Sequence, residues 1–297
     1  MKSGAGRKKH LANIGLFYSA AVWGATFYIV KQALDEIDPV LLVGYRFTLA
    51  ALILGMILAI FKRPLFMDFG KGAMLGLWLC LLYITQTIGL GITTASNSGF
   101  ITGTFVAFVP LFSLLIFRQR PTAPGIIAAL ISMAGLWLLT GRLGEINAGD
   151  LLTVITAMVY AVHILFADRY MKGGADPYIL SFQQFLFVGV VSLLAALVFD
   201  KQFVSVSVKV TRVIIFLSLF PTLSAFVIQV AAQKFISPVR VSLIFAFEPV
   251  FAALFAWTLG NEPVTAGKIA GGFLVFLALV IAGIQPGKDG FFKFRSA

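Results

Sequence analysis

Long apolar segments alternate with short polar connections along the whole chain. A run of about 20 apolar residues is long enough to cross the hydrocarbon core of a bilayer. Such a segment must be helical, because lipid offers no hydrogen-bond partner to an unpaired backbone group. The pattern predicts an all-α membrane protein with ten transmembrane helices, at residues 11–30, 39–61, 71–92, 95–117, 122–140, 149–168, 177–199, 212–233, 238–259 and 265–285.

The composition excludes the soluble classes of protein. Hydrophobic residues make up 60% of the 297 residues and charged residues only 12%, against about 25% charged residues in globular domains. A net charge of +11 would suggest a nucleic-acid partner in a soluble protein, but here the basic residues lie between apolar segments. We therefore expect a lipid bilayer around the chain and no nucleic acid. Cys80 is the only cysteine, and no His, Cys or carboxylate pattern suggests a metal or a cofactor.

The distribution of lysine and arginine predicts how the chain is oriented. With the N-terminus inside, the inner segments carry sixteen of these residues and the outer segments six, while Arg46 lies within a span. Because cytoplasmic segments carry the excess of basic residues, we expect residues 1–10 and 286–297 to be cytoplasmic tails. The chain is then a multi-pass protein of a bacterial inner (plasma) membrane. The 200–212 loop, with three basic residues, departs from the pattern.

The two halves of the chain repeat each other. Residues 11–141 and 149–285 each hold five predicted spans, and similar residues recur at a shift that drifts from 137 to 142 positions. Because five is odd, the second half enters the membrane from the opposite side, which gives two inverted five-helix repeats around a central cavity. The matched positions include Trp23 with Tyr160, Thr26 with His163, Asp38 with Asp176, Arg46 with Gln184 and Pro110 with Pro249.

Pro110 and Pro249 lie at corresponding places in two of these spans. Proline removes one helix donor and disturbs the carbonyl one turn earlier, so we expect both residues to break their helices. Interrupted helices at matching places in the two halves indicate the binding site of a duplicated transporter.

The first and sixth spans carry matching polar and aromatic stripes. Their members recur at i, i+4 and i+7 and therefore share one helical face. Lipid offers polar groups no partner, so the two stripes are expected to line the shared cavity. Alternatively, the hydroxyl groups bond to their own helices and the tryptophan packs beside Gly24. The stripes are Ser19, Trp23 and Thr26, and Thr156, Tyr160 and His163.

Glu248 is the costliest residue within a span. A carboxylate near the bilayer centre costs roughly 2.5–3.5 kcal/mol, so it needs water, a proton or a cation. It could bind a cationic group or a coupling proton, or it could pair with a fixed partner. His163, the only histidine within a span, could also take part in proton coupling, because the usual pKa of histidine is about 6.5. Its alternative role is structural.

Arg46 has three alternatives. It could be the charge partner of Glu248, it could hold a substrate carboxylate, or it could extend outward to Asp35, Glu36 or Asp38.

Other polar residues within spans either line the cavity or join helices by hydrogen bonds. They are Tyr83, Gln86, Asn97, Thr104, Gln229 and Gln233. Small residues at Gly125-x-x-x-Ala129 and Gly267-x-x-x-Gly271 either pack the halves together or form a homodimer contact.

Several of these motifs resemble one known family, the EamA family of the drug/metabolite transporter superfamily. They are Trp23-Gly24, the run from Asn97 to Gly103, Pro110-Leu111, the run from Glu248 to Phe251, and Gly260-Asn261-Glu262. The resemblance covers about residues 13–140 and 150–284. It implies ten helices around a central cavity and export or exchange of small metabolites such as amino acids. The first half has Arg118-Gln119-Arg120 where the second has Gly260-Asn261-Glu262, so no role for that glutamate carries over.

The sequence thus predicts a secondary transporter, an exporter of a small-molecule substrate such as an amino acid, with proton coupling at Glu248 and His163. A nucleotide-sugar or phosphate-ester exchanger would need several basic residues within spans, and Arg46 is the clear one. A membrane-embedded enzyme would need clustered acids or a Ser/His dyad, so we expect no catalytic residue. A scaffold protein would use Glu248 and Trp23 for assembly and carry no flux.

Overall fold

The computed structural model describes residues 2–93, 95–140, 147–201, 207–259 and 265–283, and the regular structure of these residues is helical. The elements are α1 (Lys2–Ala33), α2 (Pro39–Ile60), α3 (Phe69–Ile92), α4 (Ala95–Gly103), α5 (Phe105–Phe117), α6 (Ala123–Thr140), α7 (Ala148–Lys172), α8 (Pro177–Val198), α9 (Val208–Leu217), the π-helix η1 (Ser218–Ser224), α10 (Ala225–Ala232), α11 (Pro238–Phe245), α12 (Glu248–Leu259) and α13 (Ala266–Gly283).

Within the described chain these elements form the ten predicted spans. Seven helical runs are long and apolar enough to cross a membrane, and α6, the α11–α12 pair and α13 are the other three. The fourth, eighth and ninth spans each contain more than one helix. The basic residues from Lys2 onward continue α1 as helix, whereas the predicted tail 286–297 lies outside the described residues. The all-α membrane fold is confirmed.

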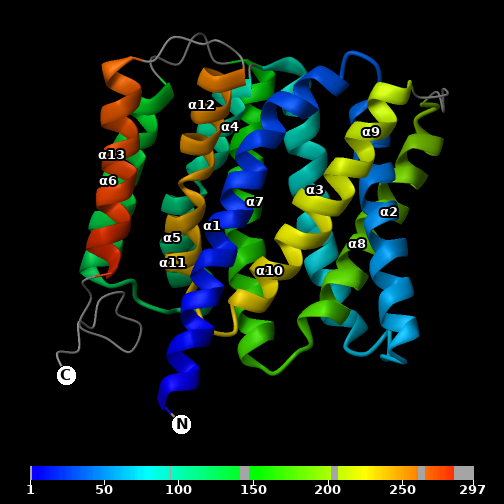
Figure 1. Ribbon diagram of the computed structural model, residues 1–297, viewed down its shortest axis with the longest axis horizontal. Coiled ribbons are helices and arrows are strands. Elements are labelled where there is room, and N and C mark those ends of the chain that lie inside the picture. Colours follow the sequence, from blue (N-terminus) through cyan, green and yellow to red (C-terminus); the bar gives the residue numbers. More distant parts are fainter. Residues whose placement is uncertain (1, 94, 141–146, 202–206, 260–264, 284–297) are drawn as a thin grey trace.

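The two repeats are inverted, as predicted. In Figure 1, α1 begins and α13 ends on the same side of the molecule, which we call the N-terminal face. The second repeat starts with α7 on the other side, which we call the opposite face. Equivalent helices of the two halves therefore run in opposite directions through the membrane.

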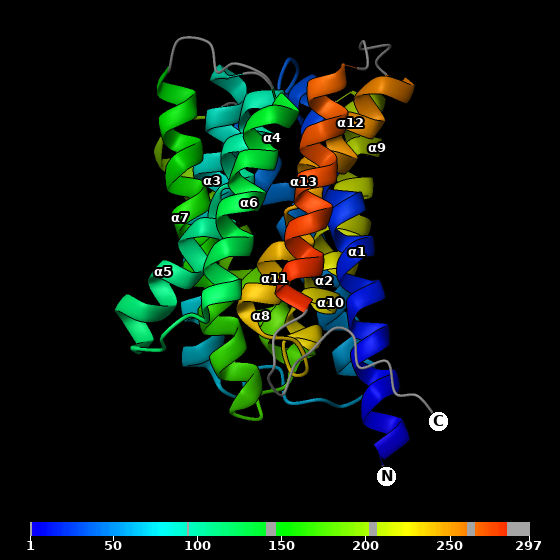
Figure 2. The same ribbon diagram turned by 90° about the vertical axis from the view of Figure 1, so that its left-hand side faces the viewer.

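Equivalent helices of the two halves also pack on each other. Contacts join α2 to α8 and α6 to α13, and these two pairs lie at opposite ends of the molecule (Figure 1). Figure 2 shows α6 and α13 side by side. The remaining helices lie between the two pairs. The middle of the molecule is thus formed by α1, α3, α7 and the three interrupted spans.

Small residues allow the α6–α13 contact. A Cβ atom added to Gly135 would lie 2.7 Å from the carbonyl oxygen of Gly271, which is closer than real Cβ atoms approach. Gly271 belongs to the small-residue motif of the last span, and Gly267 of the same motif faces the Leu138 carbonyl oxygen. Gly267 and Gly271 therefore pack the two halves together. The alternative, a homodimer contact, stays a prediction.

Symmetric ion pairs close both ends of the α2–α8 pair. The side chains of Asp38 and Asp176 accept hydrogen bonds from the first backbone N–H groups of α2 and α8, which is the usual function of an N-cap aspartate. Each cap also pairs with a base of the other repeat: Asp38 with Lys201 at 3.1 Å, and Asp176 with Arg63. The two bases occupy equivalent positions, so the sequence repeat extends to these contacts.

Replacing Asp38 by alanine should lower stability by about 1 kcal/mol, the usual cost of a lost N-cap. The midpoint of thermal unfolding in detergent measures this change. Asp38→Asn is the matched control, because asparagine still caps the helix but loses the exposed ion pair with Lys201, which is worth roughly 0–1 kcal/mol. If the asparagine variant unfolded as early as the alanine variant, the ion pair and not the cap would stabilise this helix start.

Candidate functional site

The ninth span is interrupted beside its proline. α11 ends at Phe245, four residues before Pro249, and α12 begins at Glu248. This is the position at which the missing proline N–H leaves a helix carbonyl without its donor. Glu248 is therefore the first residue of α12, where the positive end of a helix dipole favours a carboxylate. The predicted break at Pro249 is confirmed.

The fourth span is interrupted at a different place. A turn at Thr104 separates α4 from α5, and Pro110 lies inside α5. The hydroxyl group of Thr104 donates to the Ile101 carbonyl oxygen at 2.6 Å, a local bond that competes with the helix. The prediction that Pro110 itself breaks the helix is wrong, because α5 continues through it.

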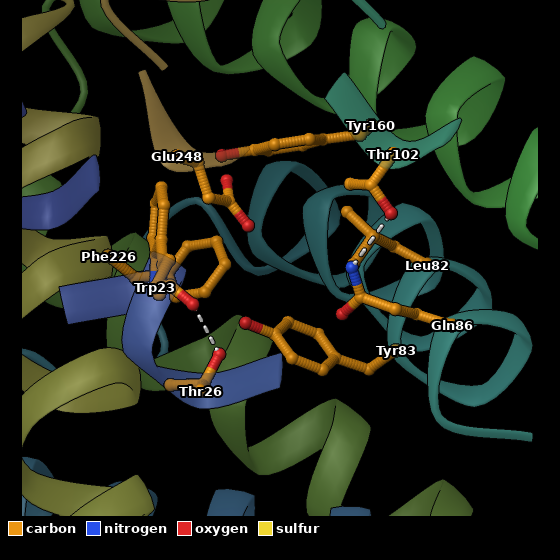
Figure 3. A pocket seen from close by; sticks show the side chains of 9 residues that line it. All are labelled: Trp23, Thr26, Leu82, Tyr83, Gln86, Thr102, Tyr160, Phe226 and Glu248. Carbon is orange, nitrogen blue, oxygen red and sulfur yellow. Dashed lines mark hydrogen bonds between the residues drawn. The ribbon is translucent and has the colours of Figure 1, made fainter. Parts of the chain in front are cut away.

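A chamber lies where the interrupted spans meet α1, α3 and α7. Figure 3 shows its lining side chains, which come from both repeats. The space between them is small, at about 20 Å³, and one water needs roughly 10–15 Å³. The space in this conformation is therefore too small for an organic metabolite. The lining residues are Trp23, Thr26, Leu82, Tyr83, Gln86, Thr102, Tyr160, Phe226 and Glu248.

Glu248 lies in the middle of this chamber. Its carboxylate points between the hydroxyl groups of Tyr83 and Tyr160 (Figure 3), and the residue is only 5% exposed. The ion pairs among the described residues do not include Glu248. Gly24 allows α1 to approach this point, because an added Cβ atom would lie 2.6 Å from the Glu248 carbonyl oxygen. The fixed charge partner considered for Glu248 is thus absent from the described part of the chain.

Aromatic rings close one side of the chamber. The Trp23 ring lies 6.2 Å from Tyr160, 4.8 Å from Phe226 and 4.9 Å from Phe245, measured between ring centroids. Tyr160 also stacks on Phe245 at 6.3 Å. We call these four residues the aromatic layer. The predicted meeting of the first and sixth spans at Trp23 and Tyr160 occurs here.

The π-helix η1 holds the indole of Trp23. The Ala225 N–H donates to the Phe220 carbonyl oxygen, five residues back, instead of to Pro221. The Pro221 carbonyl oxygen instead accepts a hydrogen bond from Trp23 Nε1 at 2.7 Å. Short π-helical segments are frequent at functional sites, and this one positions a residue of the chamber.

Arg46 binds neither Glu248 nor the acids of the first loop. It is buried, its Nε donates to Thr222 Oγ1 at 2.9 Å, and its guanidinium lies 4.7 Å from the centroid of the Tyr83 ring. Glu36 accepts instead from Lys209 at 3.0 Å and Asp38 pairs with Lys201. The predicted pairing of Arg46 with Glu248 and its predicted extension to the loop acids are therefore wrong, because its Nε bonds to the η1 hydroxyl and its guanidinium lies on the Tyr83 ring. Tyr83 lines the chamber, whereas Arg46 does not.

Gln86 and Thr26 lie on the wall nearer the opposite face, since α1 and α3 both run in that direction past Trp23 and Tyr83. The Gln86 amide donates to Thr102 Oγ1 at 3.3 Å. The Thr26 hydroxyl donates to the Trp23 carbonyl oxygen at 2.7 Å. This wall therefore offers neutral polar groups to a bound molecule.

The other predicted cavity residues do not line the chamber. Ser19 donates to the Ala225 carbonyl oxygen at 3.2 Å, and Thr156 bonds to the Thr85 hydroxyl group at 2.8 Å. Both hydroxyl groups also bond to carbonyl oxygens of their own helices, Ser19 to Gly15 and Thr156 to Leu152, as their alternative interpretation held. Thr104 bonds within its own segment. Asn97 lies in α4, but its side chain is outside the described part. His163, Gln229 and Gln233 are buried on the far side of the aromatic layer.

Sequence reasoning missed Leu82, Thr102, Phe226 and the η1 segment. Thr102 lies within the run from Asn97 to Gly103 that carried the family resemblance, and Pro221 is a third proline in the interior of a predicted span. The rule applied to Pro110 and Pro249 would have found Pro221. Phe226 gave no signal, because it is one of 30 phenylalanines.

Comparisons with known proteins agree on one family. The EamA-like transporter family matches residues 10–141 and 147–284. An uncharacterized transporter of Archaeoglobus fulgidus is 30% identical over 94% of this chain and 88% of its own length. The uncharacterized inner membrane transporter YedA of Escherichia coli (strain K12) is 25% identical over 90% and 89%.

A solved crystal structure shares the fold, with a TM-score of 0.76 and 16% sequence identity, over 92% of this chain and 96% of that one. The match of the family to both repeats fits the ten helices and the chamber between them. The chain belongs to the EamA-like transporter family and is an integral, multi-pass membrane protein.

Proposed function

We propose that this protein is a secondary transporter that exports a small organic metabolite with an amino group, such as an amino acid. One observation carries the proposal: the buried carboxylate of Glu248 lies between the two inverted repeats without an ion pair to a described base. A carboxylate at this depth needs a cation or a proton, and a transported ammonium group would supply the cation.

The surroundings of the carboxylate also suit a cation. Trp23, Tyr83, Tyr160 and Phe226 present aromatic rings to the chamber. The faces of such rings attract ammonium groups, more strongly where water is excluded. Thr26, Gln86 and Thr102 add neutral hydrogen-bonding groups. Together they favour a molecule with one ammonium group and a polar remainder.

The same carboxylate supports proton coupling. Glu248 can bind an ammonium group when it is ionised, or it can be neutralised by a proton. The two ligands then compete for one site, which is the condition for exchanging cargo against protons. In an exporter, protons would enter as cargo leaves, so the proton gradient would drive efflux.

A phosphate-ester or nucleotide-sugar cargo has less support. None of the described residues that line the chamber is basic. Arg46, the buried base of the second span, does not belong to the lining, and its guanidinium lies against the Tyr83 ring. A doubly charged phosphate would meet the negative charge of Glu248 without a compensating cation.

Transport requires the chamber to expand. A volume of about 20 Å³ is far below the roughly 300–1,000 Å³ of small-molecule sites. Three spans are interrupted, at Thr104, at Ala246-Phe247 and in η1. At these positions a span can bend without the loss of regular α-helical hydrogen bonds. We infer that they act as hinges between a state open to one face and a state open to the other.

Fusions at the chain ends test the proposed orientation in a bacterial inner membrane. We expect green fluorescent protein fused after Ala297 to fluoresce and alkaline phosphatase fused there to be inactive, because the excess of basic residues places the N-terminal face in the cytoplasm. A phosphatase inserted in the 202–206 segment is the matched positive control. Active phosphatase at Ala297 would reverse the orientation and hence the direction of transport.

Glu248→Gln should reduce flux of the amino-group cargo by at least about tenfold, since hydrogen bonds to a charged group are worth roughly 1.5–3 kcal/mol. Radiolabelled amino acids and amines, tested as a panel in proteoliposomes, provide the measurement. Thr156→Val is the control, because this buried threonine lies outside the chamber. Unchanged flux in Glu248→Gln would remove the carboxylate from the binding site. Absence of flux for all cargo classes would favour a scaffold.

Efflux should carry protons in the opposite direction. Proteoliposomes loaded with cargo and an internal pH dye should acidify as cargo leaves, because each released molecule frees Glu248 for a proton. The acidification should disappear in Glu248→Gln even where some efflux remains. Cargo efflux from the unmodified protein without any pH change would point instead to exchange or to simple facilitated movement.

A further inference from the structure

A second group of buried polar side chains lies beyond the aromatic layer. It consists of His163 on α7, Gln184 on α8, Gln229 on α10 and Gln233, the residue that follows α10. Each of these residues is fully buried, with 0% exposure. We call it the inner polar cluster. None of its members belongs to the lining of the chamber around Glu248.

Two hydrogen bonds and one ring contact place the cluster around α7. His163 Nε2 bonds to Gln184 Oε1 at 2.9 Å, and the Gln233 amide donates to the Ile164 carbonyl oxygen at 2.7 Å. The Phe226 ring on α10 lies 6.1 Å from that of His163, so both Phe226 and Gln233, the residue after α10, contact α7. Gln229 lies between them on the same helical face. The polar side chains of Gln229 and Gln233 thus lie on the side of α10 that faces α7.

Many polar atoms of the cluster have no partner. They are His163 Nδ1, Gln184 Nε2, both terminal atoms of Gln229 and Gln233 Oε1. Buried polar groups are nearly always hydrogen-bonded, and those that are not call for an explanation. Side chains serving only to join helices would pair with one another. The five unpaired atoms, from three neighbouring spans, can instead form hydrogen bonds with water or with a polar ligand.

The cluster lies on the N-terminal side of the aromatic layer. α7 and α10 both run toward the N-terminal face (Figure 1), so His163 and Gln229 lie nearer to that face than Tyr160 and Phe226 do. The ring centroids of Tyr160 and His163 are 6.4 Å apart. The aromatic layer therefore separates the chamber from the cluster, with polar groups on both sides of it.

The inverted repeat relates the two sides. Thr26 is equivalent to His163, Trp23 to Tyr160 and Arg46 to Gln184. Thr26 lines the chamber on the side of the opposite face, and the inversion carries its position to that of His163 on the side of the N-terminal face. If the two repeats exchange conformations during transport, His163 comes to line the chamber as Thr26 does here.

We propose that the inner polar cluster lines the transport path when it opens to the N-terminal face, with the aromatic layer as the barrier that parts. This inference rests on the proposed transport function. The cluster contains amides and an imidazole, so it suits water and the uncharged or hydrogen-bonding parts of the cargo. The ammonium group would stay with Glu248.

Thiol labelling tests the inference without knowledge of the cargo. Gln229→Cys and Gln233→Cys are made in a Cys80→Ala background, and a membrane-impermeant methanethiosulfonate with a fixed positive charge is applied to each face of sealed vesicles. Ser132→Cys on α6 is the matched control, since Ser132 is also fully buried and its hydroxyl also lacks a partner. It lies outside both the cluster and the chamber.

The reagent should modify Gln229→Cys from the N-terminal face at least about tenfold faster than Ser132→Cys, because only a path that opens exposes the thiol. It should not react from the opposite face unless Phe226→Ala removes part of the barrier. Gln233→Cys should behave in the same way and replaces Gln229→Cys if that variant does not fold. Rates equal to that of Ser132→Cys at both positions would overturn the inference.

The labelling and flux experiments separate the two proposals. Cargo flux together with unreactive cysteines at 229 and 233 would leave the transport function standing and reject the path. Reactive cysteines in a protein without amino-group flux would support the path and reject the cargo.

Discussion

A carboxylate in the middle of a membrane protein is the constraint on which the rest of this structure depends. Lipid cannot solvate Glu248, so the fold must surround it with polar groups or supply a counter-ion. The chain does this by starting a helix at Glu248, by bringing the Tyr83 and Tyr160 phenols to it, and by keeping the described bases away. Such a site stays available for a ligand that comes and goes.

The inverted repeat gives this site two similar sides. The contacts of α2 with α8 and of α6 with α13, and the reciprocal ion pairs of Asp38 and Asp176, join equivalent parts of the two halves. The interrupted spans and η1 lie between these pairs. Continuous helices thus form the two ends of the molecule, while the three spans with breaks all contribute side chains to the chamber around Glu248.

The two repeats differ at some equivalent positions, and these differences determine which chemical groups lie on each side of the aromatic layer. Glu248 has an apolar equivalent, Val109, in the first repeat, and Thr26 has an imidazole, His163, in the second. Polar groups on the two sides of the aromatic layer therefore differ in kind. The carboxylate side can hold charge, whereas the cluster around His163 offers neutral donors and acceptors. A molecule passing between them would change hydrogen-bond partners while its charged group stayed near one residue.

The sequence by itself determined the ten spans and their inversion, because apolar length and the odd number of spans per half are properties of the chain alone. It also identified Glu248, Trp23 and Tyr160, since charge and matching aromatic positions are visible without neighbours. The tertiary structure decided which polar residues share one chamber. Helical periodicity places Ser19 with Trp23, and Tyr160 with His163, on common faces, but the helix packed against each face determines the outcome. The Ser19 hydroxyl is hydrogen-bonded to α10, the His163 imidazole is hydrogen-bonded to α8, and the indole of Trp23 is hydrogen-bonded to the π-helix.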